Sequence, residues 1–323
     1  GSNLTNVGTI TGSGGISLDA GGTFDNSAGT VTTSDTNNPI TITANDWVLD
    51  GGTITTGTSG GAVTLDRTAG QQISLGTALT TAELATVTTS GNFTIGSASN
   101  SDGVDIAADV AFAGTTPNVK LVSGLGAVTD TLGANSITAA NLDMTAKTGV
   151  GSAGNAIKTT VSGNLSATNT TSGEIYLAPT AGVTLGGGGT IIDEQVANGT
   201  ISVAAGGAID IAGNLNVSGG GNSTIILNAT GNLTRSAGTV TAKDISLTAN
   251  TADGGVGTGV APILTAATGT LTLSAGTGGA FINNTGSVAL AAPTLGANAP
   301  ITVKSTGTLT LPAFAFDSGT GSI

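Results

Sequence analysis

The amino-acid sequence of 323 residues predicts an all-β fold, a single parallel β-helix with about three short strands in each coil. Two observations predict this fold. Short segments that alternate apolar and polar residues recur along the whole chain, and long stretches of the sequence resemble one another. Because side chains alternate between the two faces of a strand, each segment has one apolar face and one face of mostly Thr or Ser.

The alternating segments follow one another at intervals of about 8–10 residues, and turns rich in Gly, Asn and Ser separate them. Three strands then make a repeat of about 20–25 residues, within the range of repeat folds. Helix signals are nearly absent, and residues 80–85 are expected to form at most one helical turn at a corner. The clearest strand segments are residues 40–43, 63–65, 73–75, 93–95, 104–106, 175–177, 183–185, 201–203, 209–211, 225–227, 245–247, 271–273 and 301–303.

The composition agrees with a thin, layered core. Charged residues make up only 8% of the chain and aromatic residues 2%, whereas Gly contributes 54 positions. Large aromatic side chains normally supply much of a globular core, so a fold built from uniform layers of Val, Ile and Leu suits this chain better. Disorder is not expected, because the mean hydropathy is +0.31 and disordered chains combine low hydrophobicity with high net charge.

Internal similarity favours a solenoid over a sandwich or barrel, which would also contain short strands. Residues 138–185 match residues 241–290, with one three-residue insertion in a Gly-rich turn. Stacked coils tolerate insertions in their turns, because each coil contacts only its neighbours. We therefore expect residues 1–323 to form one continuous β-solenoid, an internal fragment of a longer protein.

Charge and cysteine content exclude several classes of function. The net charge of −12 repels phosphate, so nucleic-acid binding is not expected. No run of 18 apolar residues exists, which argues against membrane insertion by a helix. The absence of Cys excludes a disulfide framework. It fits either a cytosolic protein or a chain exported unfolded through a pore, and the repeats favour export.

Catalytic constellations are missing from the sequence. Without His or Cys the chain has no Ser-His-Asp or Cys-His nucleophile and no zinc site of the usual kind. The run from Gly186 to Gly189 lacks the Lys-Ser/Thr of a phosphate loop, so we interpret it as a turn. The guanidinium groups of Arg67 and Arg235 are far apart in sequence. The chain is therefore predicted not to be an enzyme.

Two carboxylate pairs require separate consideration, because β-helices also carry polysaccharide-degrading enzymes. Asp105 should point outward from its strand, close to Asp102, whereas Asp193 and Glu194 are consecutive and should face opposite ways. We predict that all four are solvated surface residues. Asp102 and Asp105 also form a weak candidate Ca²⁺ site within the oxygen-rich segment 100–105. The segment is not repeated, so we predict no metal or cofactor, with Ca²⁺ as the alternative.

Threonine and aromatic residues suggest two further alternatives. Outward pairs such as Thr41 and Thr43, or Thr270 and Thr272, fit an ice-binding solenoid locally. The intervals between strands vary too much in the sequence to show long ranks of Thr, so a solvated strand face is expected. The larger aromatic residues could instead form a sugar-stacking platform, but we expect them in the core. They are Trp47, Phe93, Phe112, Tyr176 and Phe281.

The order of strands and turns in residues 139–185 resembles the repeat region of filamentous-haemagglutinin-like exoproteins, the two-partner-secretion adhesins of Gram-negative bacteria. The second copy ends with residues 280–286, and residues 50–96 are similar to another unit of giant members. The resemblance implies a right-handed parallel β-helix that is exported through an outer-membrane pore. It also implies location at the bacterial cell surface and a role in attachment or biofilm.

One departure from the family restricts this expectation. The secretion domain of such proteins carries an Asn-Pro-Asn-Gly or Asn-Pro-Asn-Leu motif, whereas Asn38-Pro39 is followed here by Ile40. The resemblance therefore implies a structural shaft segment, whose partners are surface glycans or proteins bound through the parent protein, the secretion pore, and neighbouring rods in lateral or end-to-end association. The alternatives are a carbohydrate-binding module, a β-helical polysaccharide-degrading enzyme and an ice-binding solenoid.

Overall fold

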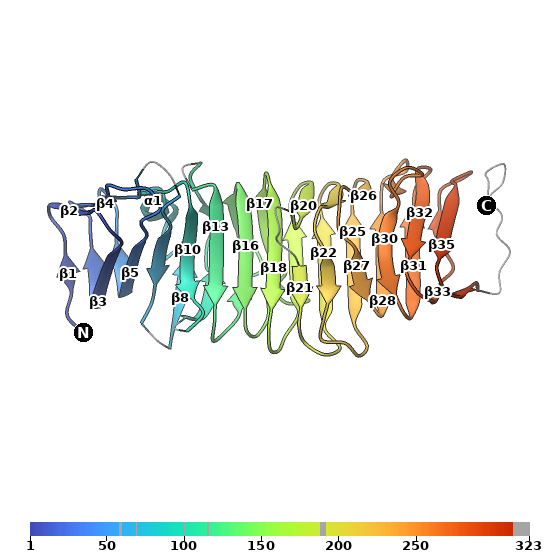
Figure 1. Ribbon diagram of the computed structural model, residues 1–323, viewed down its shortest axis with the longest axis horizontal. Helices are drawn as coiled ribbons and strands as arrows, with labels where there is room; N and C mark the ends of the chain where they lie inside the picture. Colours follow the sequence, from blue (N-terminus) through green and yellow to red (C-terminus); the bar gives the residue numbers. More distant parts are fainter. Residues whose placement is uncertain (58–59, 69, 100, 115, 188–191, 313–323) are drawn as a thin grey trace. The chain divides into compact units, whose positions relative to one another are not determined.

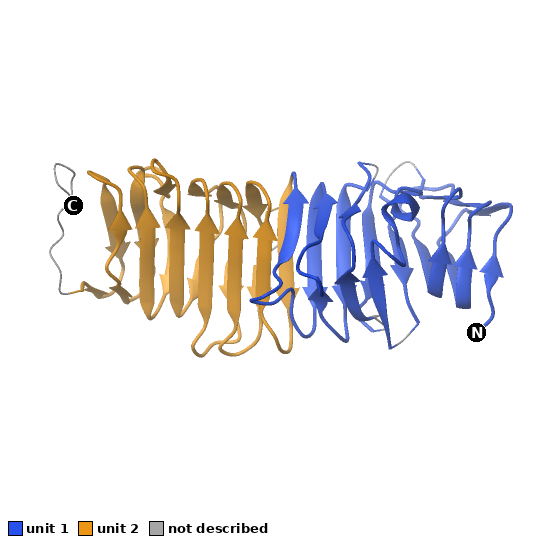
Figure 2. Ribbon diagram, turned by 180° about the vertical axis from the view of Figure 1, so that it is seen from behind, with its two compact units in different colours: residues 1–162 blue, residues 163–323 orange. Residues whose placement is uncertain are grey.

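The structure is a computed structural model, and it describes residues 1–57, 60–68, 70–99, 101–114, 116–187 and 192–312. It confirms the predicted fold class: 53% of the chain lies in strands and 1% in helix, and the strands belong to stacked parallel coils of a β-solenoid. Residues 1–162 and residues 163–323 form two compact units, here called unit 1 and unit 2 (Figure 2). In the described residues no helix is long and apolar enough to cross a membrane.

Unit 1 is built from parallel ladders in which strands of successive coils pair with one another (Figure 1). The first ladder contains β1 (Leu4–Thr5), β3 (Ile16–Asp25), β5 (Ile40–Val48), β7 (Val63–Asp66), β10 (Asn92–Ser97), β13 (Asn118–Ser123) and β16 (Asn141–Ala146). The second contains β8 (Gln71–Leu75), β11 (Ser101–Ile106) and β14 (Val128–Thr129).

The remaining strands of unit 1 form two shorter parallel stacks. One contains β2 (Thr9–Gly12), β4 (Thr30–Thr33), β6 (Thr53–Thr55) and β9 (Val87–Thr88). The other contains β12 (Val110–Ala111), β15 (Ser136–Ala139) and β17 (Ile157–Val161). The single helical turn α1 (Thr81–Leu84) falls inside the predicted segment 80–85 and precedes β9.

Unit 2 shows the predicted three strands per coil clearly. Its first ladder begins with β18 (Asn164–Asn169), which pairs with both β20 (Val183–Leu185) and β21 (Ile192–Glu194) of the next coil. It continues through β23 (Ile209–Ile211), β24 (Leu215–Val217), β26 (Leu233–Arg235), β27 (Val240–Ala242), β29 (Gly255–Val256), β30 (Ile263–Ala267), β32 (Gly279–Asn284) and β35 (Ile301–Ser305). The second ladder contains β19 (Ile175–Pro179), β22 (Thr200–Ala205), β25 (Thr224–Ala229), β28 (Asp244–Ala249), β31 (Thr270–Ala275), β33 (Val288–Leu290), β34 (Thr294–Leu295) and β36 (Leu309–Thr310).

The core of each coil is a narrow stack of aliphatic side chains in register. In the first ladder of unit 1, apolar residues of successive coils lie opposite one another in one rank, and nearly all of them are buried. Its members are Leu18, Ile42, Leu65, Ile95, Leu121 and Met144. Ile42, Leu65 and Ile95 are completely buried. Burial of such side chains stabilises each coil by roughly 1.5–3 kcal/mol per residue, before the entropy of ordering the chain is subtracted.

Buried polar side chains also link neighbouring coils at one turn of unit 1. The amide nitrogen of Asn6 donates to Asn26 Oδ1 at 2.8 Å, and the amide nitrogen of Asn26 donates to the carbonyl oxygen of Thr53 at 3.1 Å. Asn26 is completely buried. These bonds satisfy groups that would otherwise be costly to bury, and they fix the strand that follows the turn.

Candidate functional site

The structure brings Asp105 under the next coil, which the sequence did not predict. Asp105 is 9% exposed, and its Oδ1 accepts hydrogen bonds from Thr129 Oγ1 at 2.9 Å and from the nitrogen and hydroxyl of Thr131 at 3.0 and 2.6 Å. Asp102 is exposed and is the extra residue at a bulge in β11. The expectation that Asp105 is a solvated, available carboxylate is therefore wrong. Among the described residues no group of three or more metal-ligating side chains could hold a metal ion.

Asp193 and Glu194 are also not solvated surface residues. Both lie in β21, where Asp193 is 7% exposed and Glu194 is completely buried. Glu194 accepts hydrogen bonds from Asn169 and from the backbone nitrogen of Val196, whereas Asp193 accepts one from the side-chain amide of Gln195 at 3.1 Å. Burial raises the pKa of Glu194 to about 7. The charge of Asp193 adds to this rise, so the two neighbouring carboxylates are electrostatically coupled.

The aromatic residues divide between core and surface. Trp47, Phe93 and Phe112 are buried, and the Phe rings meet edge to face with centroids 5.9 Å apart. The core prediction is confirmed for these three. It is wrong for Tyr176 and Phe281, which are half-buried. The Tyr176 hydroxyl donates to the Glu174 carboxylate, and partial burial raises the pKa of Tyr176 to about 12. No shared stacking platform results in the described part of the chain.

Threonine ranks in register do exist in unit 1, contrary to the expectation from strand intervals. Across β2, β4, β6 and β9 one rank aligns Thr11, Thr32, Thr55 and Thr88. A second rank aligns Thr9, Thr30 and Thr53, and Thr53 Oγ1 donates to Thr30 Oγ1 at 3.1 Å. The intervals differ because turns of different length separate strands that stay in register.

The remaining predicted residues play local structural roles. Gly186 and Gly187 have φ angles of 66° and 110°, which agrees with the predicted turn, whereas Gly188 and Gly189 lie outside the described residues. In unit 2, Arg235 Nε donates to the carbonyl oxygen of Pro262 at 2.9 Å. Arg67 is different, because it lines a cleft.

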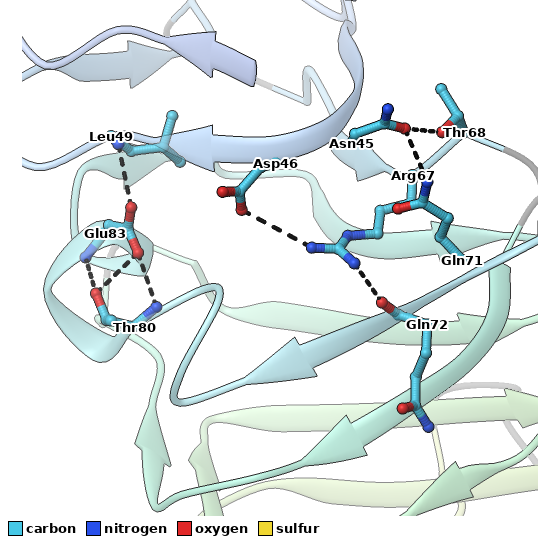
Figure 3. A network of polar contacts seen from close by, with 9 residues as sticks. All are labelled: Asn45, Asp46, Leu49, Arg67, Thr68, Gln71, Gln72, Thr80 and Glu83. Atoms are coloured by element: carbon cyan, nitrogen blue, oxygen red, sulfur yellow. Dashed lines mark hydrogen bonds and ion pairs between the residues drawn. The ribbon is translucent and has the colours of Figure 1, made fainter. Parts of the chain in front are cut away.

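This cleft in unit 1, here called the Trp47 cleft, has a volume of about 660 Å³. It opens where the end of β5 and the residues after it face the longer coil that contains β8 and α1 (Figure 3). Its wall is mainly polar. The lining residues are Asn45, Asp46, Trp47, Asp50, Arg67, Gln71, Thr77, Ala78, Thr80 and Glu83.

Arg67 lies at the centre of the wall (Figure 3). One of its terminal nitrogens donates to the carbonyl oxygen of Gln72 at 2.7 Å, and the other lies 3.8 Å from Asp46 Oδ1. The guanidinium carbon is 5.6 Å from the centroid of the Trp47 ring, within the range of a cation–π contact. Burial lowers the pKa of Arg67, and the neighbouring charge of Asp46 opposes that effect. The guanidinium therefore lies over the ring of the buried Trp47.

Asn45 fixes one end of the wall. Its amide nitrogen donates to the carbonyl oxygen of Gly21 at 2.7 Å, which attaches the end of β5 to the preceding coil. Its Oδ1 accepts hydrogen bonds from the Thr68 hydroxyl and from Gln71 Nε2, the latter at 3.2 Å. The hydrogen-bonding capacity of Asn45 is thus largely satisfied within the protein.

A capping box holds the opposite end. Thr80 is the N-cap of α1, and its hydroxyl accepts a hydrogen bond from the backbone nitrogen of Glu83 at 3.2 Å. The Glu83 carboxylate accepts in return from the backbone nitrogen of Thr80 at 2.9 Å and from that of Leu49 at 3.3 Å. Glu83 therefore joins the two segments that form the cleft, and its carboxylate is committed to structure.

Two donors on this wall have no partner within the described part of the chain. They are Trp47 Nε1 and Arg67 Nε, and both atoms are buried. Trp47 is only 2% exposed. An unpaired buried donor costs roughly 1–3 kcal/mol, so this wall is not optimised for stability alone.

The sequence reasoning missed this site. It placed Trp47 in the core and treated Arg67 as an isolated cation. A usable signal was present in the sequence. Ionic and amide side chains are concentrated within six positions, at Asn45, Asp46 and Asp50 around Trp47, in a chain that is only 8% charged.

Comparisons with known proteins identify no relative. No family model matches this chain, and neither the curated proteins nor the solved structures contain a match. The chain is therefore described by its fold, a parallel β-solenoid, and by the geometry of its cleft.

Proposed function

We propose that this chain is a structural shaft segment of a large secreted adhesin on the surface of a Gram-negative bacterium. The observation that carries the proposal is the regular ladder: in each unit, strand after strand pairs in parallel with the next coil and keeps its register. Such a fold extends along one axis, because each coil covers the apolar edge of its neighbour.

The mechanism is mechanical. Ladder hydrogen bonds run between coils, and aliphatic ranks bury the interior, so a stack of coils resists bending and holds a binding region at a distance. The absence of Cys suits export of the unfolded chain through an outer-membrane pore, because no disulfide can form before passage. The parent protein then attaches to surface glycans or proteins, and rods associate laterally or end to end in a biofilm. The proposal includes no catalytic step.

The register of unit 2 provides a direct test. Thr200 of β22 lies opposite Thr224 of β25, so removal of residues 200–223 deletes one whole coil and preserves the pairing on either side. Cells that make the parent protein with this deletion should still secrete it. They should also still attach to the surface that cells with the intact protein bind. As a matched control, removal of residues 200–211 deletes half a coil and should abolish export of folded protein.

A loss of attachment with normal secretion of the whole-coil deletion would contradict a passive shaft. It would show that the deleted coil itself binds the target.

A further inference from the structure

We propose that the Trp47 cleft binds a hydroxylated ligand that carries a protonated amine, namely an amino sugar whose nitrogen is not acetylated. This inference goes beyond the shaft function and does not depend on it. It follows from the hydrogen-bonding groups that line the cleft, from their charge and from the place of Trp47.

The cleft is large enough for a ligand of this kind. A volume of about 660 Å³ lies within the range of roughly 300–1,000 Å³ for small-molecule sites. Its two sides come from segments that the fold holds in place, since Asn45 bonds to Gly21 and Glu83 bonds to Leu49. The two sides of the cleft are thus in place before a ligand arrives.

The groups with spare hydrogen-bonding capacity are mainly acceptors. Asp50 and Thr77 are exposed and make no hydrogen bond within the described residues, and the Asp46 side chain is 53% exposed with only a 3.8 Å ion pair to Arg67. Gln71 uses its amide nitrogen on Asn45, and its side-chain oxygen is a further acceptor. The rim therefore favours a ligand with several N–H and O–H donors.

The charge of the wall selects a cation among such ligands. Asp46, Asp50 and Glu83 carry three carboxylates against the single guanidinium of Arg67. A phosphate, sulfate or uronic acid would be repelled, and a neutral sugar would leave Asp50 without a counter-charge and Asp46 with only its 3.8 Å ion pair to Arg67. A protonated amine in the cleft that Asp46 and Asp50 both line supplies the charge and three donors.

Two unpaired donors in the cleft explain why the proposed ligand carries hydroxyl groups. Trp47 Nε1 and Arg67 Nε are donors without partners in the described part of the chain. Both donors are covered in the ligand-free protein, so a sugar hydroxyl reaches them only when the Arg67 side chain moves aside. A hydroxyl is both donor and acceptor, and it then brings an acceptor to the place where the fold lacks one. A simple alkyl amine has no atom for this role.

The chain offers a direct probe, because Trp47 is its only tryptophan. The fluorescence of the intact protein should be titrated with a glucosamine tetramer, an N-acetylglucosamine tetramer, cellotetraose and trilysine. We expect the glucosamine tetramer to change the Trp47 emission and to bind at least about tenfold more tightly than the other three. Added salt should weaken this binding.

Matched variants locate the site. Asp46→Asn and Asp50→Asn should each weaken binding of the glucosamine tetramer by about fivefold or more, whereas Asp35→Asn, an exposed acid outside the cleft, should not change it. Circular dichroism should confirm that all three variants fold.

Any one of several results would overturn the proposal. These are no binding of the glucosamine tetramer, equal affinity for the acetylated or the neutral tetramer, and binding that both cleft variants leave intact. If trilysine bound as tightly as the amino sugar, the ligand would be a basic peptide, and the sugar assignment would be wrong.

Discussion

The side-chain nitrogen of Asn169 lies 3.0 Å from each carboxylate oxygen of Glu194 in the buried interior of unit 2. The backbone nitrogen of Val196 also donates to Glu194 Oε1, at 3.0 Å. Within the described residues, Asn169 Oδ1 has no donor. Two donors thus satisfy the Glu194 carboxylate, whereas burial of the side chain disfavours its charge.

The stability of the protein should therefore depend on pH through Glu194. Burial raises its pKa from 4.5 to about 7; the hydrogen bonds from Asn169 and Val196 oppose the shift, and the charges of Glu174 and Asp193 add to it. The pKa of Glu194 is higher in the folded than in the unfolded protein. Its contribution to the free energy of unfolding is therefore complete below pH 4.5 and is lost as the pH rises through 7. Urea unfolding should show a loss of about 1–2 kcal/mol, less than the whole shift implies because the protein relaxes and water penetrates around a newly charged buried group.

Glu194→Gln supplies the control for this pH dependence. The amide cannot ionise, so the variant should keep the same unfolding free energy between pH 4.5 and pH 8. An unchanged slope in the variant would assign the effect to other groups. Asp25 does not interfere, because hydrogen bonds from Ser27 lower its pKa and confine its titration to more acidic solution.

Truncation of a core rank should destabilise unit 1 strongly. Ile42 is completely buried between Leu18 and Leu65 of the neighbouring coils. Ile42→Ala should lower the free energy of unfolding by about 2–5 kcal/mol, through lost burial and the cavity that remains. Thr41→Ala, on the outward face of the same strand, should change it by less than about 0.5 kcal/mol. Equal effects of the two substitutions would contradict the inward rank.

Removal of the buried Asn26 side chain should show how much the polar link between coils contributes to the free energy of unfolding. Asn26→Ala removes one acceptor of the Asn6 amide, which keeps its bond to the carbonyl oxygen of Thr30, and removes the side-chain donor to the Thr53 carbonyl oxygen. We expect a loss of about 1–3 kcal/mol in chemical unfolding. Ser34→Ala, at an exposed turn, serves as the comparison and should remain within about 0.5 kcal/mol of the parent chain.

Loss of the N-cap should loosen one side of the Trp47 cleft. Thr80→Ala removes the hydroxyl that caps Glu83 and one of the bonds to its carboxylate. The protein should lose about 0.5–2 kcal/mol of stability, the usual cost of such a cap. Trp47 fluorescence should shift toward that of a more solvated indole. Thr81→Ala, at the next exposed position, should leave the emission unchanged.

The fold was predictable because its signal is local. Alternation at residues 40–43, 63–65 and 93–95 records which side chains face the core, and the structure pairs these three segments in successive coils. The self-similarity of the sequence is less informative about position. Residues 183–185 and 288–290 match in sequence, yet β20 and β33 belong to different ladders of unit 2.

The candidate site was not predictable from the same local signal. Burial of Asp105 depends on Thr129 and Thr131 of a later segment, and burial of Glu194 depends on Asn169 in an earlier coil. Alternation along one strand contains no information about which residue from another coil covers an outward side chain. For the same reason the sequence did not predict the Trp47 cleft. Its walls come from segments of different coils, and the lengths of the turns between strands decide that these segments meet.

The unequal spacing of Thr11, Thr32, Thr55 and Thr88 along the chain has an evolutionary consequence. The coil that contains β8 and α1 is longer than those before it, yet the threonine rank passes across it unbroken. Extra residues therefore leave the stack sideways and create the wall of a cleft without altering the pitch of the ladder. A protein of this architecture can acquire a new recognition site by lengthening one turn, while selection preserves the rest of the stack unchanged.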